Sequence, residues 1–124
     1  MIELGDEKVL YAFDKELEPA LVVPSGTTVR VRTKDCFGNQ VQRPEDELDE
    51  IDWDHINPAT GPIFVEGAVP GGALKVTIEA IEFDGQTASC TGEGEGVCGD
   101  RFDAWSTHLC KIDGDELVWD EELR

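Results

Sequence analysis

The clearest structural signal in the sequence is the stretch Asn57-Pro58-Ala59-Thr60-Gly61-Pro62-Ile63-Phe64-Val65-Glu66-Gly67-Ala68. Its prolines and Gly61 predict a turn, because proline fixes φ and glycine adopts backbone conformations that other residues avoid. The apolar run from Ile63 to Glu66 predicts a short β-strand, and the glycines of residues 67–72 predict a bend that ends it. We therefore expect a turn, a strand and a second bend.

The sequence on both sides of this stretch also predicts strands, because its apolar residues recur mostly with a period of two. Turn residues, including 13 glycines and 6 prolines, separate the apolar runs. Strands are predicted at residues 8–13, 20–23, 28–33, 63–66, 74–83, 107–112 and 116–119. In residues 28–33 the alternation predicts that Val29 and Val31 face a core, whereas Arg30 and Arg32 face outward.

Residues 74–83 form the longest predicted strand. The apolar positions of its first part are Leu74, Val76 and Ile78, which share one face. The apolar parity then shifts to Ile81 and Phe83, and such a shift turns every later side chain to the opposite face. We expect a β-bulge near Ala80 to absorb it. Hairpin-type turns are predicted at Asp84-Gly85 and Asp113-Gly114.

These patterns predict an all-β fold of the β-sandwich or jelly-roll type, in one domain that spans residues 1–124. A chain of 124 residues can bury one core. Nothing between the predicted strands resembles a crossover helix, which disfavours a parallel sheet. The last predicted strand leaves a sheet edge available for pairing, so we expect the sandwich to be incomplete without a partner.

The net charge of −18, from 28 acidic and 10 basic residues, restricts the partners of the chain. Nucleic acids and anionic membranes are excluded, because both attract clustered Lys and Arg. An acidic surface suits solubility or life in high salt, as in a halophile. The N-terminus resembles no export signal and no apolar run approaches a membrane span, which predicts a cytoplasmic protein. The cysteines Cys36, Cys90, Cys98 and Cys110 are accordingly expected to be free thiols.

The first candidate functional residue is Asp35, in a polar loop just past a predicted strand end. Loops at strand ends commonly carry function. Asp35 could bind a hard metal or orient a substrate amide, and it could equally accept backbone amides in an Asx-type turn. Cys36 has no adjacent base, which favours a buried thiol over a nucleophile.

The second candidate is Glu66, which ends the apolar strand of the opening stretch. A carboxylate in that position is solvated, paired, or used as an acid, a base or a metal ligand. The remaining candidates are weaker. The set of Cys90, Cys98, His108 and Cys110 lacks zinc-site spacing, and each of the two histidines reads more simply as a surface or packing residue. Residues 45–54 contain seven acids and predict a solvated loop.

Three stretches together resemble the acetamidase/formamidase family. They are residues 19–33 with their Val-Pro-Ser-Gly turn, the loop Asp35-Cys36-Phe37-Gly38-Asn39-Gln40, and the Asn57 to Ala68 stretch followed by Pro70-Gly71. The last is the most specific, because a twelve-residue match with two prolines and a Thr-Gly-Pro turn rarely arises by chance. The resemblance covers essentially all 124 residues but corresponds to the N-terminal part of a longer family.

The resemblance implies a jelly-roll-like sandwich, hydrolysis of formamide, acetamide or related short amides to acid and ammonia, and a divalent metal, zinc or calcium, in or near the site. It implies that Asp35 and Glu66 line this site. Asp35 would be catalytic and a metal ligand, Glu66 would act as general base or position the substrate amide, and Gln40 would bind the amide. These two carboxylate roles could be exchanged.

The family also uses a later glycine-rich stretch carrying Asp, His and Asn, and the sequence stops before it. A metal-activated water needs about three protein ligands and an open position. We therefore expect a fragment or split subunit that is completed by a C-terminal-half subunit or a homo-oligomer. The alternative is a non-catalytic β-sandwich that serves as a scaffold or interaction subunit.

Overall fold

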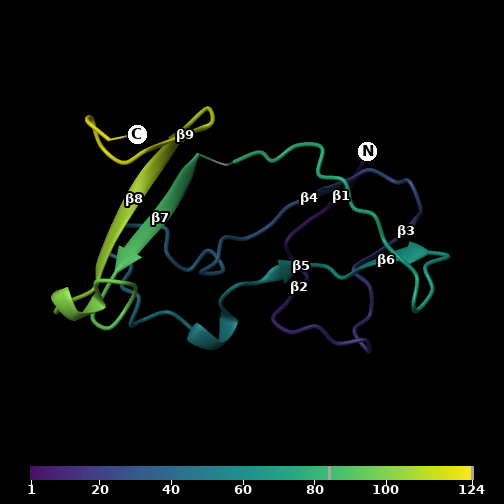
Figure 1. Ribbon diagram of the computed structural model, residues 1–124, viewed down its shortest axis with the longest axis horizontal. Helices are drawn as coiled ribbons and strands as arrows, with labels where there is room; N and C mark the ends of the chain where they lie inside the picture. Colours follow the sequence, from purple (N-terminus) through teal and green to yellow (C-terminus); the bar gives the residue numbers. More distant parts are fainter. Residues whose placement is uncertain (84, 124) are drawn as a thin grey trace. The chain divides into compact units, whose positions relative to one another are not determined.

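The computed structural model describes residues 1–83 and 85–123 and confirms the predicted all-β fold (Figure 1). The strands are β1 (Ile2–Leu4), β2 (Val9–Leu10), β3 (Leu21–Pro24), β4 (Val29–Val31), β5 (Ala59–Thr60), β6 (Ile63–Glu66), β7 (Gln86–Thr91), β8 (Ser106–Asp113) and β9 (Glu116–Val118). Helical structure in these residues is confined to the 3₁₀ turns η1 (Trp53–His55) and η2 (Gly99–Arg101). Neither turn, nor any other described segment, is a helix that could cross a membrane.

The backbone divides into two compact units. Unit 1 contains residues 1–39 and 53–77, and unit 2 contains residues 40–52 and 78–124. Each unit combines segments that are distant in sequence. The prediction of a single domain stays a prediction.

Unit 1 consists of three separate two-stranded pairs. Strands β1 and β4 pair in parallel, β2 and β5 pair antiparallel, and β3 and β6 pair in parallel. The two parallel pairings differ from the sequence expectation, which used the lack of crossover helices to disfavour parallel strands. Here the connections contain other strands and loops rather than a crossover α-helix, and they return the chain to the same end of the neighbouring strand.

The stretch from Asn57 to Ala68 connects the segments of unit 1. Beyond the pairing of β5 with β2 and of β6 with β3, hydrogen bonds tie it to earlier parts of the chain: Asn57 N–H to Cys36 O (2.6 Å), Thr60 Oγ1–H to Arg32 O (2.8 Å), Gly61 N–H to Lys8 O (3.1 Å) and Ala20 N–H to Pro62 O (2.8 Å). Gly61 is buried and has φ of 141°, a conformation that requires glycine. The predicted strand that follows is β6, with the predicted ends.

Unit 2 is built on the antiparallel sheet β7-β8-β9. The predicted Asp113-Gly114 turn joins β8 to β9, and Gly114 has the positive φ of 64° that this turn requires. Val41, Leu48 and Cys110 are buried in unit 2. Leu48 lies within the acidic run of residues 45–54, so this predicted loop is anchored by an apolar side chain rather than wholly solvated.

The predicted strand at residues 74–83, with its bulge near Ala80, is wrong. The structure gives these residues no regular secondary structure. Their apolar side chains are largely exposed: Leu74 62%, Val76 76%, Ile78 73%, Ile81 69% and Phe83 64%. A strand requires a neighbour for its backbone groups, and the described residues pair none with this segment.

Smaller differences have the same origin. Within the predicted strand at residues 8–13 only β2 forms, because only Val9 and Leu10 find a partner strand. In β4 Val29 is half-buried, whereas Val31 is 38% exposed and does not face a core. The predicted turn at Asp84-Gly85 includes Asp84, which lies outside the described residues.

Candidate functional site

Glu66 ends β6, opposite Pro24 of β3. Its side chain is exposed and makes no hydrogen bond or ion pair within residues 1–83 and 85–123. The turn that follows is closed by Ala68 N–H donating to Val65 O at 3.2 Å, and Gly67 there has φ of 79°. The strand therefore delivers a solvated carboxylate at a fixed position, which is one of the alternatives that the sequence left open.

Asp35 adopts the Asx-type arrangement that the sequence analysis weighed against a catalytic role. Its Oδ1 accepts a hydrogen bond from Asn39 N–H at 2.7 Å, and Asn39 Oδ1 accepts one from Asp35 N–H at 3.0 Å. Gly38 N–H donates to Asp35 O at 3.0 Å. This exchange holds Asn39 at φ of 63°, which Asn tolerates better than most residues. Asp35 thus fixes the loop that carries it.

Gln40 uses both atoms of its side-chain amide. Its Oε1 accepts from Asp52 N–H at 2.8 Å, and its Nε2 donates to Asp52 O at 3.2 Å. Gln40 therefore mimics a backbone strand partner for Asp52 and closes the acidic loop between them.

The three predicted site residues belong to different units of the structure. Asp35 and Glu66 belong to unit 1 and share no hydrogen bond. Gln40 belongs to unit 2, so its position relative to the two carboxylates is not defined.

The described residues do not fit a complete metal site. Within them no group of three or more His, Cys, Asp or Glu side chains comes together. The carboxylate of Asp35 is also engaged by Asn39 N–H. The zinc or calcium predicted from the family resemblance would need ligands from outside the described residues.

Both histidines pack against aromatic side chains, whereas the prediction of a buried Cys36 thiol is wrong. His55 packs edge-on against Tyr11, with ring centroids 4.8 Å apart. His108 stacks on Trp119 at 4.1 Å, and its Nε2 lies 2.8 Å from Trp119 O. All four cysteines are free thiols, although Cys36 is exposed rather than buried.

Asp46, which the sequence did not single out, is held by several hydrogen-bond donors. Asp46 Oδ2 accepts from the N–H groups of Gln42 and Arg43 at 2.8 and 2.9 Å, and its Oδ1 accepts from Arg43 Nη2 at 2.7 Å. These backbone donors and the guanidinium lower the pKa of Asp46 below its ordinary value. Its carbonyl also accepts from Thr107 Oγ1 at 3.1 Å, so Asp46 anchors the acidic loop to β8.

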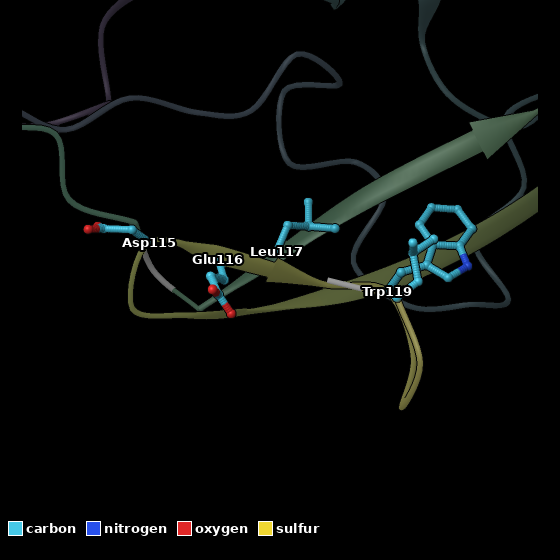
Figure 2. Close-up of a pocket in the computed structure, with 5 residues that line it drawn as sticks. Asp115, Glu116, Leu117 and Trp119 are labelled. Carbon is cyan, nitrogen blue, oxygen red and sulfur yellow. The ribbon is translucent and has the colours of Figure 1, made fainter.

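An open hollow of about 550 Å³ lies beside β9 (Figure 2). It is lined by Asp115, Glu116, Leu117, Trp119 and Leu123. The stacking of His108 on Trp119 follows from the hairpin register. His108 lies in β8 and Trp119 directly follows β9, and the Asp113-Gly114 turn makes the two residues diagonal neighbours across the strands. None of the predicted site residues lines the hollow.

The structure describes an all-β chain with a solvated carboxylate at the end of β6. Residues 4–110 match the acetamidase/formamidase family, and the chain belongs to that family. The hollow beside β9 lies beyond the matched residues. No curated protein sequence matches the chain.

Solved structures support the same assignment. A predicted acetamidase/formamidase of Thermoanaerobacter tengcongensis is 43% identical, with a TM-score of 0.91 over 98% of this chain and 40% of that one. An acetamidase of Bacillus halodurans is 35% identical, with a TM-score of 0.84 over 99% of this chain and 42% of that one. An acetamidase of Yersinia enterocolitica, at 18% identity and a TM-score of 0.68, shares the fold. The chain thus spans about two fifths of the length of these relatives.

Proposed function

We propose that this chain is part of a hydrolase that acts on the carbon-nitrogen bond of short linear amides, formamide and acetamide, and that it works together with the remaining part of the family fold. The observation that carries the proposal is the match of residues 4–110 to the acetamidase/formamidase family. The coverage of only 40% and 42% of two related structures favours a fragment or a subunit over a complete enzyme.

In this proposal Glu66 supplies the base. Amide hydrolysis requires that water lose a proton as it attacks the carbonyl carbon and that the leaving nitrogen gain one to depart as ammonia. A carboxylate at a strand end, without a partner among the described residues, can take the first proton and return it to the nitrogen. Alternatively it can accept a hydrogen bond from the substrate N–H groups and orient the amide.

Asp35 and Gln40 have supporting roles in the same proposal. Asp35 fixes the loop of residues 35–39 through Asn39, and its predicted role as a metal ligand stays a prediction. Gln40 would bind a substrate amide only after releasing Asp52, because both atoms of its amide are bonded there.

A non-catalytic scaffold or interaction subunit is the second candidate. It is favoured by the structural engagement of Asp35 and Gln40 and by the lack of a three-ligand group in residues 1–83 and 85–123. Under this alternative the chain keeps the family scaffold and contributes no reacting group.

Ammonia release from formamide and acetamide distinguishes the two candidates. The assay compares this chain, a complementary chain made from the part of the T. tengcongensis relative outside the match, and their mixture. We expect turnover only in the mixture and a loss of about a hundredfold or more with Glu66→Gln, which removes the base but keeps the shape. Equal turnover with Glu66→Gln would remove Glu66 from the mechanism. No turnover by the mixture, with binding demonstrated, would favour the scaffold.

A further inference from the structure

The parallel pair of β3 and β6 has two faces of unlike character. Its register places Leu21 opposite Ile63, Val22 opposite Phe64, Val23 opposite Val65 and Pro24 opposite Glu66. Because side chains alternate along a strand, Val22, Pro24, Phe64 and Glu66 share one face. We call these four residues the outer face of the β3–β6 pair.

Apart from Glu66 the outer face is apolar, and it is uncovered. Val22 is 53% exposed and Phe64 is 48% exposed, whereas Val23, on the opposite face, is 4% exposed. The exposed fractions therefore alternate with the strand period along β3, whereas in β6 the contrast is smaller, because Ile63 on the opposite face is itself 36% exposed.

Parallel strands rarely tolerate this situation. Parallel sheets in proteins have both faces covered, and a two-stranded sheet is marginally stable in water. The β3–β6 pair is two-stranded within the described residues. Its outer face thus has the chemistry of an interior surface that lacks its cover.

The missing cover is identified by the size of the relatives and by the surface of this chain. More than half of each related structure lies outside the match. The chain exposes 9948 Å², whereas a compact protein of 13.6 kDa exposes about 6,600 Å² and two separate domains of half that mass about 7,900 Å². A second copy is an unfavourable cover because each copy carries a charge of −18.

We propose that the outer face of the β3–β6 pair is the docking surface for the part of the acetamidase/formamidase fold that lies outside the match, and that docking buries Phe64 and places Glu66 at the junction. The role of Glu66 in chemistry rests on the proposed function, but the docking does not. A carboxylate enclosed at a junction is costly unless it is paired, so the docked polypeptide must present a cation, N–H donors or the bound amide to Glu66.

The test measures binding of the 124-residue chain to the complementary chain of the T. tengcongensis relative by titration calorimetry. Phe64→Ser should weaken binding about tenfold or more, because truncating a buried aromatic anchor typically has this effect. Phe13→Ser is the matched control: Phe13 belongs to the same unit, is 99% exposed and lies outside the outer face. It should leave the dissociation constant within about twofold.

Hydrogen exchange provides a second readout that does not depend on the variants. The backbone amides of β3 and β6 should become protected when the complementary chain is added, while those of β8 and β9 change little. Circular dichroism of Phe64→Ser checks that the chain still folds, and Val22→Ser should weaken binding in the same direction.

The proposal is overturned if the complementary chain does not bind, if Phe13→Ser and Phe64→Ser weaken binding equally, or if sedimentation shows that the chain alone dimerises through Phe64. Its failure is distinguishable from that of the proposed function. Binding that depends on Phe64 without ammonia release leaves the docking surface standing and rejects the hydrolase. Ammonia release that is insensitive to Phe64→Ser rejects the docking surface and leaves the hydrolase standing.

Discussion

The two units of this chain differ in how much of their structure they stabilise by themselves. Unit 2 contains a three-stranded antiparallel sheet and three of the four buried hydrophobic residues in the described chain, Val41, Leu48 and Cys110. Unit 1 contains three two-stranded pairs and one such residue, Val23. A hairpin closes a short loop, whereas parallel pairs close long ones, so unit 1 depends more on tertiary support. In this family such support is expected from the part outside the match.

The largest effect on stability is expected from disruption of the core of unit 2, because it would remove the difference in stability between the two units. Cys110 is 1% exposed in β8, and Cys110→Asp would bury a charge without a partner. We expect the free energy of unfolding of unit 2 to fall by about 4 kcal/mol. Protection of the β7, β8 and β9 amides against hydrogen exchange reports the loss. Lys111→Asp, which places the same carboxylate on the next and exposed residue, should leave that protection nearly unchanged.

A smaller effect is expected in unit 1. Val23→Ala removes buried methyl groups and should lower the stability of the β3–β6 pair by about 2 kcal/mol, measured from amide exchange in β6. Val22→Ala is the control, because Val22 is the neighbouring residue on the exposed face. If Val22→Ala and Val23→Ala lower the stability of the isolated chain equally, Val22 is as buried as Val23. The outer face would then not be exposed as described.

The smallest effect concerns the acidic loop of unit 2. The pKa of Asp46 is lowered by the backbone N–H of Gln42 and by Arg43, so its contribution to stability is present above the unfolded-state pKa and is lost as pH falls through the folded-state value. Loop protection at Gln42 and Arg43 should therefore decrease below about pH 4. Asp46→Asn should weaken this protection at neutral pH as well, whereas Asp49→Asn, a change at an exposed carboxylate of the same run, should not.

The sequence predicted those elements whose partners are close or whose turns require special residues. The β8–β9 hairpin follows from Asp113-Gly114, and β6 was predicted with its observed ends because the turns around it need proline and glycine. The parallel pairing of β3 with β6 could not be predicted, since nothing local to Leu21–Pro24 specifies a partner about forty residues away. For the candidate site, the sequence located Glu66 at a strand end but left Asp35 and Gln40 ambiguous.

The sequence by itself determined the all-β class, the acidic charge and the membership in a family of amide hydrolases, because alternation, composition and turn motifs are local properties. Only the tertiary structure decided that Asp35 closes its own loop, that Gln40 clamps Asp52, and that residues 74–83 form no strand. These outcomes depend on which backbone groups find partners. A segment with a strand-like sequence forms no β-ladder without a neighbouring strand. A polar side chain close to an unpaired backbone N–H group accepts a hydrogen bond from it.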